Sequence, residues 1–208
     1  MSIDDLRKGH GKFKTKIKME TNQENISNNH QVEQVREVLQ LFQDGYTARD
    51  ASKLDQFMEL FYPSEEIELI GIGASIRGGN EWFQGLAAVR DIIEGDWEYW
   101  GNVLLEVEGA KISVQGDVAW LSTTGSIEQT DTHDKALKYY LEQMKEMLED
   151  ENEDQDMRLL EATHFGMRRL RERLKGKGYQ WPFVFTAVLI HTPEGWRFHT
   201  IHWSMPVD

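Results

Sequence analysis

The sequence contains no cysteine, is short of basic side chains and has no long apolar run. The absence of cysteine excludes disulfides, thiolate metal sites and cysteine nucleophiles, and it fits a reducing compartment. With 36 acidic against 23 basic side chains, the formal net charge of -13 disfavours binding to nucleic acid and to anionic membranes. Because the first residues lack an apolar signal segment and no later run is long enough to span a bilayer, we expect a cytoplasmic protein.

The length of 208 residues suits a single domain with one core. We place this domain at residues 30–208, after a polar N-terminal extension at residues 1–29. Within the extension, lysines alternate with apolar or small residues from Lys12 to Met19. This segment is either a solvated tail or an amphipathic edge strand whose lysines discourage aggregation.

Apolar residues recur every three or four positions in three segments, which is the spacing of helices with one apolar face. The first helix is expected from about residue 30 to Arg49. The second begins after Asp50, a capping residue, and stops at Pro63. The third is expected over residues 85–94.

Strand signals follow the helices. Residues 65–75 alternate between apolar and polar side chains and lead into a glycine-rich turn. Two strands within residues 102–128 meet at Gly116 and Asp117, which is a hairpin signal. The C-terminal stretch predicts two more strands, closed by a turn at residues 193–195. Helices followed by an antiparallel sheet indicate an α+β fold.

Residues 131–178 depart from this pattern, because they are charged and favour helix. We expect a helical insertion between sheet strands, with two helices joined by an acidic loop. The loop resembles a calcium-binding EF-hand loop in its spacing, but Gln155 stands where that loop needs glycine and Arg158 stands at its ninth position. We therefore expect no calcium binding. The acidic and amide residues at ligand positions are Asp150, Asn152, Asp154, Asp156 and Glu161.

Three separated segments carry a family resemblance: QLFQDGYTARDASKLDQFMELFYP, GLAAVRDIIEGDWEYWGNVLLEVEGAKISVQGDVAW and FTAVLIHTPEGWRFHTIHWSMP. Over residues 30–130 and 181–205, the chain resembles the SnoaL-like, ketosteroid-isomerase-like branch of the nuclear transport factor 2-like superfamily. The resemblance implies a cone-shaped, curved antiparallel sheet wrapped around three N-terminal helices. Members of this superfamily include isomerases, polyketide cyclases, dehydratases and noncatalytic association domains, so the fold alone does not fix an activity.

The resemblance also argues against one reaction. Ketosteroid isomerases use a tyrosine and a protonated aspartic acid to hold an oxyanion, and a strand carboxylate to move the proton. The matching positions here are Phe42 for the tyrosine, Leu69 or Ile70 for the carboxylate, and Thr186 for the acid. Because none of these side chains can do that work, we do not expect ketosteroid isomerase chemistry.

Strand alternation predicts which residues face a pocket. His202 is the best candidate for acid or base catalysis, because a neutral imidazole accepts a proton near physiological pH, and Glu128 is the second candidate. A structural, hydrogen-bonding role for His202 is the alternative. The expected ligand-binding residues are Tyr46, Trp120, Ser122, Thr124, Ser126, Thr186, Thr200 and Ser204.

Alternation places Ile201 and Trp203 on the opposite side of the last strand, where an apolar face predicts a homodimer. Since His199 and His202 also fall on opposite faces, we expect no metal site, and nothing indicates a cofactor. The leading hypothesis is a SnoaL-like protein that binds a small organic molecule or transforms it without a cofactor. The competing hypothesis is a noncatalytic association or regulatory module whose insertion docks a partner. A proton acceptor in the pocket would favour the enzyme.

Overall fold

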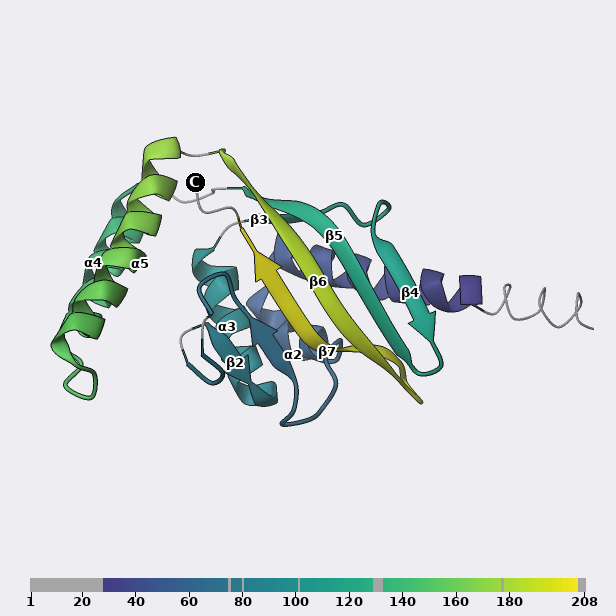
Figure 1. The fold of residues 1–208 in the computed structure, drawn as a ribbon. Helices are drawn as coiled ribbons and strands as arrows, with labels where there is room; N and C mark the ends of the chain where they lie inside the picture. Colours follow the sequence, from purple (N-terminus) through teal and green to yellow (C-terminus); the bar gives the residue numbers. More distant parts are fainter. Residues whose placement is uncertain are drawn as a thin grey trace, which may run out of the picture.

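The computed structural model of the chain describes residues 28–74, 76–79, 81–100, 102–128, 133–176 and 178–205. The segment from Lys12 to Met19, for which the sequence leaves a tail and an edge strand open, lies outside the described residues. Helices cover one face of a curved sheet, and a helical hairpin projects from one end (Figure 1). The prediction of an α+β fold with a helical insertion is therefore confirmed.

Three helical segments cover the sheet, close to where the apolar spacing predicts them. The first helix covers residues 28–48, and a 3-10 turn, η1 (Ala51–Lys53), leads into the short helix α2 (Leu54–Met58). The carboxylate of Asp50 caps this turn by accepting a hydrogen bond from a backbone N–H two residues on. The third helix, α3 (Gly85–Tyr99), extends past its predicted end. No helix in the described ranges is both long and apolar enough to cross a membrane.

Seven strands form one sheet in the order β2-β1-β7-β6-β5-β3, and β4 also pairs with β5. The pairing of β1 with β7 is parallel, whereas the other pairs of these strands are antiparallel. Of the strand expected at residues 65–75, only the middle part forms, because the glycine-rich stretch that follows makes a turn. The sequence does not predict β2. The strands are β1 (Glu68–Ile70), β2 (Trp82–Gln84), β3 (Asn102–Leu105), β4 (Lys111–Gln115), β5 (Val118–Glu128), β6 (Gln180–Thr192) and β7 (Gly195–Ser204).

Two tight turns connect the long strands, both at the predicted places. The β4–β5 turn consists of Gly116 and Asp117, and the φ of 60° at Gly116 is a left-handed conformation that glycine adopts without strain. The β6–β7 turn lies at Pro193 and Glu194. These turns fix the register of β4 against β5 and of β6 against β7, so that each face of these pairs has a defined set of side chains.

Phe42 stands at the centre of the core, between the first helix and the sheet. Its ring centroid lies 4.9 Å from that of Tyr46, 5.4 Å from that of Phe185 and 6.0 Å from that of Trp203. None of these four side chains is more than 1% exposed. Aromatic pairs of this kind contribute about 0.5–1.5 kcal/mol each beyond the burial of their area, so this cluster anchors the helix to the sheet.

The predicted faces of the last strand are wrong, because β7 contains a β-bulge. Consecutive residues of β6 pair with Thr200 and with Phe198, so His199 is an extra residue in β7. A bulge of one residue shifts the alternation of side chains that follow it. As a result, Ile201 and Trp203 share the buried face with Phe198 and are only 1% exposed. The apolar outer face that these two residues were expected to form does not exist.

The helical insertion consists of two antiparallel helices, α4 (His133–Glu149) and α5 (Gln155–Lys175). The two helices pack chiefly against each other. A Cβ atom added to Gly166 would lie 2.8 Å from the Cε atom of Met144, so glycine permits the close approach of the two helices here. Tyr140 and Ala162 are buried in the same hairpin.

Candidate functional site

A cavity of about 100 Å³ lies among α3, strand β1, strand β2 and the end of β7. Its wall is mostly apolar and carries three charged side chains, a composition that is typical of small-molecule sites. A space of this size holds a few waters or a small organic group. We regard it as the candidate functional site. The lining residues are Leu69, Gly71, Ile72, Glu81, Phe83, Ile92, Asp96, Trp100, Arg169 and Trp203.

Asp96 is the carboxylate that α3 contributes to the cavity wall. The hydroxyl of Tyr46 donates a hydrogen bond of 3.0 Å to Oδ2 of Asp96. Tyr46 is fully buried, and burial, the charge of Asp96 and their hydrogen bond raise the pKa of Tyr46 well above its usual value. The phenol therefore stays protonated over the whole physiological range. It holds the Asp96 carboxylate in place from behind the cavity wall.

Glu81 lines the cavity from the turn directly before β2. Its φ of 56° is unusual for a residue with a side chain and costs about 1–3 kcal/mol. Its Oε2 atom accepts a hydrogen bond from the backbone N–H of Gly73, and its backbone carbonyl accepts one from the N–H of Gly71. A Cβ atom on Gly71 would lie 2.9 Å from the Glu81 side chain, so glycine is needed there for Glu81 to fold back over this turn.

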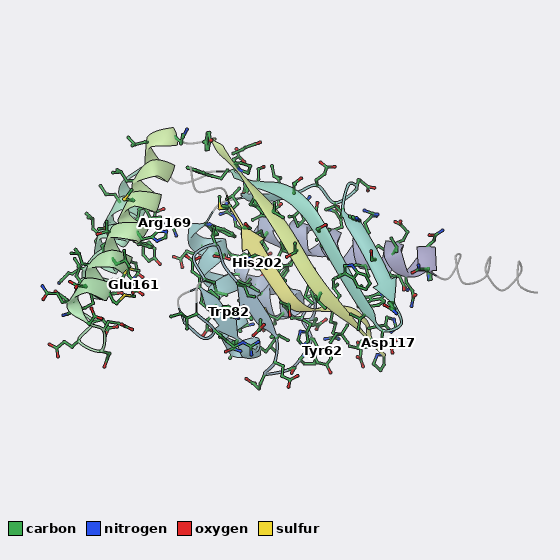
Figure 2. All side chains as sticks on the ribbon, viewed as in Figure 1. Tyr62, Trp82, Asp117, Glu161, Arg169 and His202 are labelled. Carbon is green, nitrogen blue, oxygen red and sulfur yellow. The ribbon has the colours of Figure 1, made fainter. Side chains whose placement is uncertain are left out.

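Arg169 lines the cavity although it belongs to the helical insertion. Its guanidinium lies 5.1 Å from the ring centroid of Tyr140 and 5.3 Å from that of Phe165, within the range of cation–π attraction. Figure 2 shows Arg169 on the side of the hairpin that faces the sheet and its helices. The insertion therefore contributes to the wall of the cavity.

Seven of the residues that the sequence assigns to the pocket lie together, but on the outer face of the sheet. Strand pairing places Ser122 beside Thr186, and Thr186 beside His202. His202 is exposed and lies on the sheet face turned away from the helices (Figure 2). None of these residues lines the cavity. Whether this outer patch binds a ligand remains a prediction. The seven residues are Trp120, Ser122, Thr124, Thr186, Thr200, His202 and Ser204.

The other three predicted site residues lie elsewhere. Tyr46 is in the core and not at a pocket mouth, and it reaches the cavity only through Asp96. Ser126 and Glu128 lie at the far end of β5, where Oε2 of Glu128 accepts a hydrogen bond of 3.2 Å from the side-chain amide of Asn102. The structure thus separates Glu128 from the cavity, and a catalytic role for Glu128 or His202 remains a prediction.

The three charged residues of the cavity escaped the prediction from sequence. For Asp96 a signal exists, because it falls three residues after the buried Ile93 and seven after the buried Val89, on the apolar stripe of α3. A carboxylate in such a stripe needs a partner or a function. No local pattern marks Glu81 or Arg169, which the fold brings to the cavity from distant segments.

A second hollow, of about 690 Å³, is an open groove among the first helix, α2 and the β6–β7 turn. It is larger than the cavity at Asp96, but of its six charged side chains only Arg197 is half-buried. The other five are exposed at the surface: Asp44, Asp50, Lys53, Glu59 and Glu194. Charged groups that remain in water make weak and unspecific contacts. We therefore regard the cavity at Asp96 as the better candidate.

The acidic loop of the insertion uses its carboxylates for local hydrogen bonds. Asp150 accepts one from the backbone N–H of Asn152, and hydrogen bonds from the backbone and the side chain of Asn152 lower the pKa of Asp150. Asp154 caps α5 by accepting from the backbone N–H groups of Asp156 and Met157. In the described part of the chain, no group of three histidine, aspartate or glutamate side chains is arranged to hold a metal ion. The absence of calcium binding remains a prediction.

Several solved structures share this fold at low sequence identity. A candidate dehydratase of the nuclear transport factor 2-like family from Streptomyces avermitilis is 15% identical, with a TM-score of 0.56, over 87% of this chain and 99% of that chain. A nuclear transport factor 2-like protein with a cystatin-like fold from Novosphingobium aromaticivorans is 12% identical, with a TM-score of 0.53, over 91% of this chain and 89% of that chain. At these identities the likeness establishes the fold and not an activity.

The family of the chain follows from its sequence. The search among curated proteins found no match. The model of the SnoaL-like domain matches residues 35–142, which is more than half of the chain. This agrees with the shared fold of the nuclear transport factor 2-like structures and confirms the resemblance seen in the sequence. The chain belongs to the SnoaL-like domain family.

Proposed function

We propose that the chain binds a small, uncharged organic molecule in the cavity at Asp96 and moves a proton on it without a cofactor. The observation that carries this proposal is a carboxylate in a mostly apolar wall, held by a fully buried tyrosine. Titratable groups in such surroundings are typical of acid–base sites. The reaction would be an isomerisation, a cyclisation or a dehydration.

The charges of the cavity favour an uncharged ligand. The carboxylates of Glu81 and Asp96 outnumber the guanidinium of Arg169, so an anionic ligand would meet an excess of negative charge. The guanidinium of Arg169, which also lines the cavity, offers N–H donors that a carbonyl or hydroxyl oxygen of the ligand could accept from.

In this proposal, Asp96 accepts a proton from a carbon atom next to a ligand carbonyl. The C–H electron pair then forms a C=C bond, and the carbonyl oxygen becomes an enolate oxygen. The guanidinium N–H donors of Arg169, which lines the cavity, would stabilise this negative charge. Return of the proton from Asp96 to another carbon completes an isomerisation. In a dehydration, the enolate electron pair instead expels a hydroxyl group from the neighbouring carbon, and the proton on Asp96 passes to this group, which leaves as water. The Streptomyces avermitilis protein, which shares the fold only, is a candidate dehydratase, so a dehydration is one of the reactions to test.

The ligand can be sought by native mass spectrometry of the purified chain and by screening small carbonyl compounds for binding by NMR. A turnover assay on the compounds that bind then compares Asp96→Asn with the wild type. We expect Asp96→Asn to lower the rate at least about a hundredfold, the usual contribution of a proton acceptor, while binding changes little. The matched control is Glu98→Gln, which removes an exposed carboxylate two positions along α3 and should leave the rate unchanged.

Two results would refute the proposal. An unchanged rate in Asp96→Asn would show that this carboxylate is not the proton acceptor. A ligand that binds in the open groove, or on the outer patch around His202, would show that the cavity is not the site.

The second candidate function is a noncatalytic association or regulatory module. It is favoured by the exposed apolar side chains of the α4–α5 hairpin, such as Leu141 and Leu174. If no small molecule binds at Asp96, this function becomes the better proposal. A homodimer, a cytoplasmic location and the absence of nucleic acid and membrane partners also remain proposals, supported by the net charge of -13 and the apolar surfaces.

A further inference from the structure

The α4–α5 hairpin exposes many large apolar side chains that its own fold leaves uncovered. Leu141 is 58% exposed, Leu170 is 56% exposed and Leu174 is 78% exposed. Scattered apolar residues on a surface are ordinary, but a contiguous apolar patch marks an interaction site. Two paired helices with a long apolar stripe are also an incomplete bundle, because each helix buries only part of its apolar surface.

These side chains lie on one face of the hairpin. Successive residues of a helix are rotated by about 100° around its axis. By this count, Leu137, Leu141 and Leu148 lie within an arc of about 40° on α4. On α5, Met167, Leu170 and Leu174 lie within an arc of about 60°. Because the two helices run antiparallel, the apolar stripe of α4 and the apolar stripe of α5 lie on the same side of the contact between the helices. We call this surface the hairpin face. It comprises Leu137, Leu141, Leu148, Met167, Leu170 and Leu174.

The hairpin face points away from the rest of the chain. With about 100° of rotation per residue, Arg169 lies about 130° around the axis of α5 from the middle of the apolar stripe. Arg169 lines the cavity and lies on the side of the hairpin that faces the sheet (Figure 2). The opposite side, which carries Leu170 and Leu174, is therefore open to a second molecule without obstruction from the chain's own sheet.

The charges of the hairpin identify the partner that fits. The tip, residues 142–156, has eight acidic residues and one basic residue, whereas the last positions of α5, residues 167–175, have five basic residues and one acidic residue. One end of the hairpin is thus acidic and the other basic. A second hairpin that lies antiparallel places each acidic tip beside a basic end, while a parallel one would bring like charges together.

We propose that the hairpin face binds the same face of a second copy of this chain, with the two hairpins antiparallel around a two-fold axis. The four helices then form a bundle with an apolar centre. Two helices about 10 Å wide and about 30 Å long offer a flat area of roughly 600 Å² per copy. This is close to the ~800 Å² per partner of a standard protein interface, before the relief of the side chains is counted.

The first test is the mass of the full chain in solution, measured by sedimentation velocity at micromolar concentration. We expect a dimer. The double variant Leu141→Ser/Leu170→Ser should raise the dissociation constant at least about a hundredfold, because four half-exposed leucines leave the two-fold interface. Its melting temperature as a monomer should stay high, since neither side chain belongs to the core.

The matched control is Trp120→Ser on the outer face of the sheet. Trp120 is 47% exposed and lies on the competing apolar surface, so this variant tests a dimer made through the sheet. We expect it to leave the dimer intact. A monomeric wild type, or a dimer that survives the double leucine variant, overturns the proposal. A dimer lost only in Trp120→Ser overturns it as well, in favour of the sheet face.

The second test measures the orientation of the hairpins. The chain has no cysteine, so Glu153→Cys and Lys175→Cys each introduce a single thiol, the first at the acidic tip and the second at the basic end. Mixed under oxidising conditions, the two variants should form a disulfide-linked heterodimer. Efficient disulfide formation by Glu153→Cys alone would place the tips together and overturn the antiparallel arrangement.

Discussion

Replacing Tyr46 by phenylalanine removes one hydroxyl from the core and keeps the ring. The hydroxyl donates a 3.0 Å hydrogen bond to Asp96, and the ring lies 4.9 Å from Phe42 and 5.8 Å from Trp203 between centroids. Since the ring contacts remain, the cost arises from the hydrogen bond alone. A hydrogen bond to a charged group contributes about 1.5–3 kcal/mol, so Tyr46→Phe should lower the free energy of unfolding by about 2 kcal/mol.

The partner of the hydroxyl is tested by a double-mutant cycle. Tyr46→Phe, Asp96→Ala and the double variant are compared with the wild type by urea denaturation at neutral pH. If the two side chains interact directly, the double variant should be less destabilised than the sum of the single variants, by about 1–2 kcal/mol. Additive effects would refute the direct interaction, because they would mean that the carboxylate does not need the phenol.

The same tyrosine predicts a dependence of stability on alkaline pH. In the unfolded chain Tyr46 ionises near pH ~10, whereas in the folded chain burial and Asp96 hold its pKa well above that value. The stability from the protonated phenol is therefore complete below pH ~10 and is lost as the pH rises from there toward the folded pKa. The loss should approach about 1.4 kcal/mol per pH unit in the wild type.

The assay for this effect is urea denaturation of the wild type and of Tyr46→Phe between about pH 8 and about pH 11. The difference in the free energy of unfolding between the two proteins should be constant below pH ~10 and should shrink above it, because phenylalanine has no proton to release. Lysines and exposed tyrosines titrate alike in both proteins and cancel. A difference that stays constant to the highest pH would refute the claim that folding shifts the pKa of Tyr46.

Two further predictions concern the outer patch and the insertion. His202→Gln should leave the free energy of unfolding and ligand binding at Asp96 nearly unchanged, because His202 is exposed and outside the cavity. Calorimetry measures the stability and NMR measures the binding. Loss of ligand binding in this variant would show that His202 belongs to the site. Replacing residues 132–177 by a short glycine-rich linker should leave a folded core, since loop closure costs rise slowly with length, and circular dichroism measures the folding. The ligand affinity of this deletion variant should fall, because Arg169 is lost from the cavity wall. A deletion variant that cannot fold would make the insertion part of the core.

The sequence was sufficient for the fold because its signals are local. The apolar spacing around Phe42 marks a helix wherever it packs, and Gly116 with Asp117 makes a tight turn from the preferences of those residues alone. The charged insertion was also recognisable, since helix propensity and cap residues such as Asp154 act over a few positions. Its apolar stripe could have been found by the same counting of positions.

The site was less accessible to sequence, and two features show why. Alternation along a strand predicts faces only if no residue is inserted, and the bulge at His199 reversed the expected side of Ile201 and Trp203. Alternation alone therefore assigns the residues of the outer patch to the pocket. Asp96 could have been noticed as a carboxylate on an apolar stripe, but its partner Tyr46 is 50 positions away, and no spacing rule joins them.

By itself, then, the sequence determined the class of the fold, its family, the places of the helices and tight turns, and the acidic character of the chain. These depend on periodicity, turn chemistry and composition, which each short segment carries with it. Only the tertiary structure decided which face of the sheet is covered and that Glu81, Asp96 and Arg169 line one cavity. The physical reason is that a site is formed by contacts between distant segments, whose relative positions depend on the packing of the whole core and on a single extra residue in one strand.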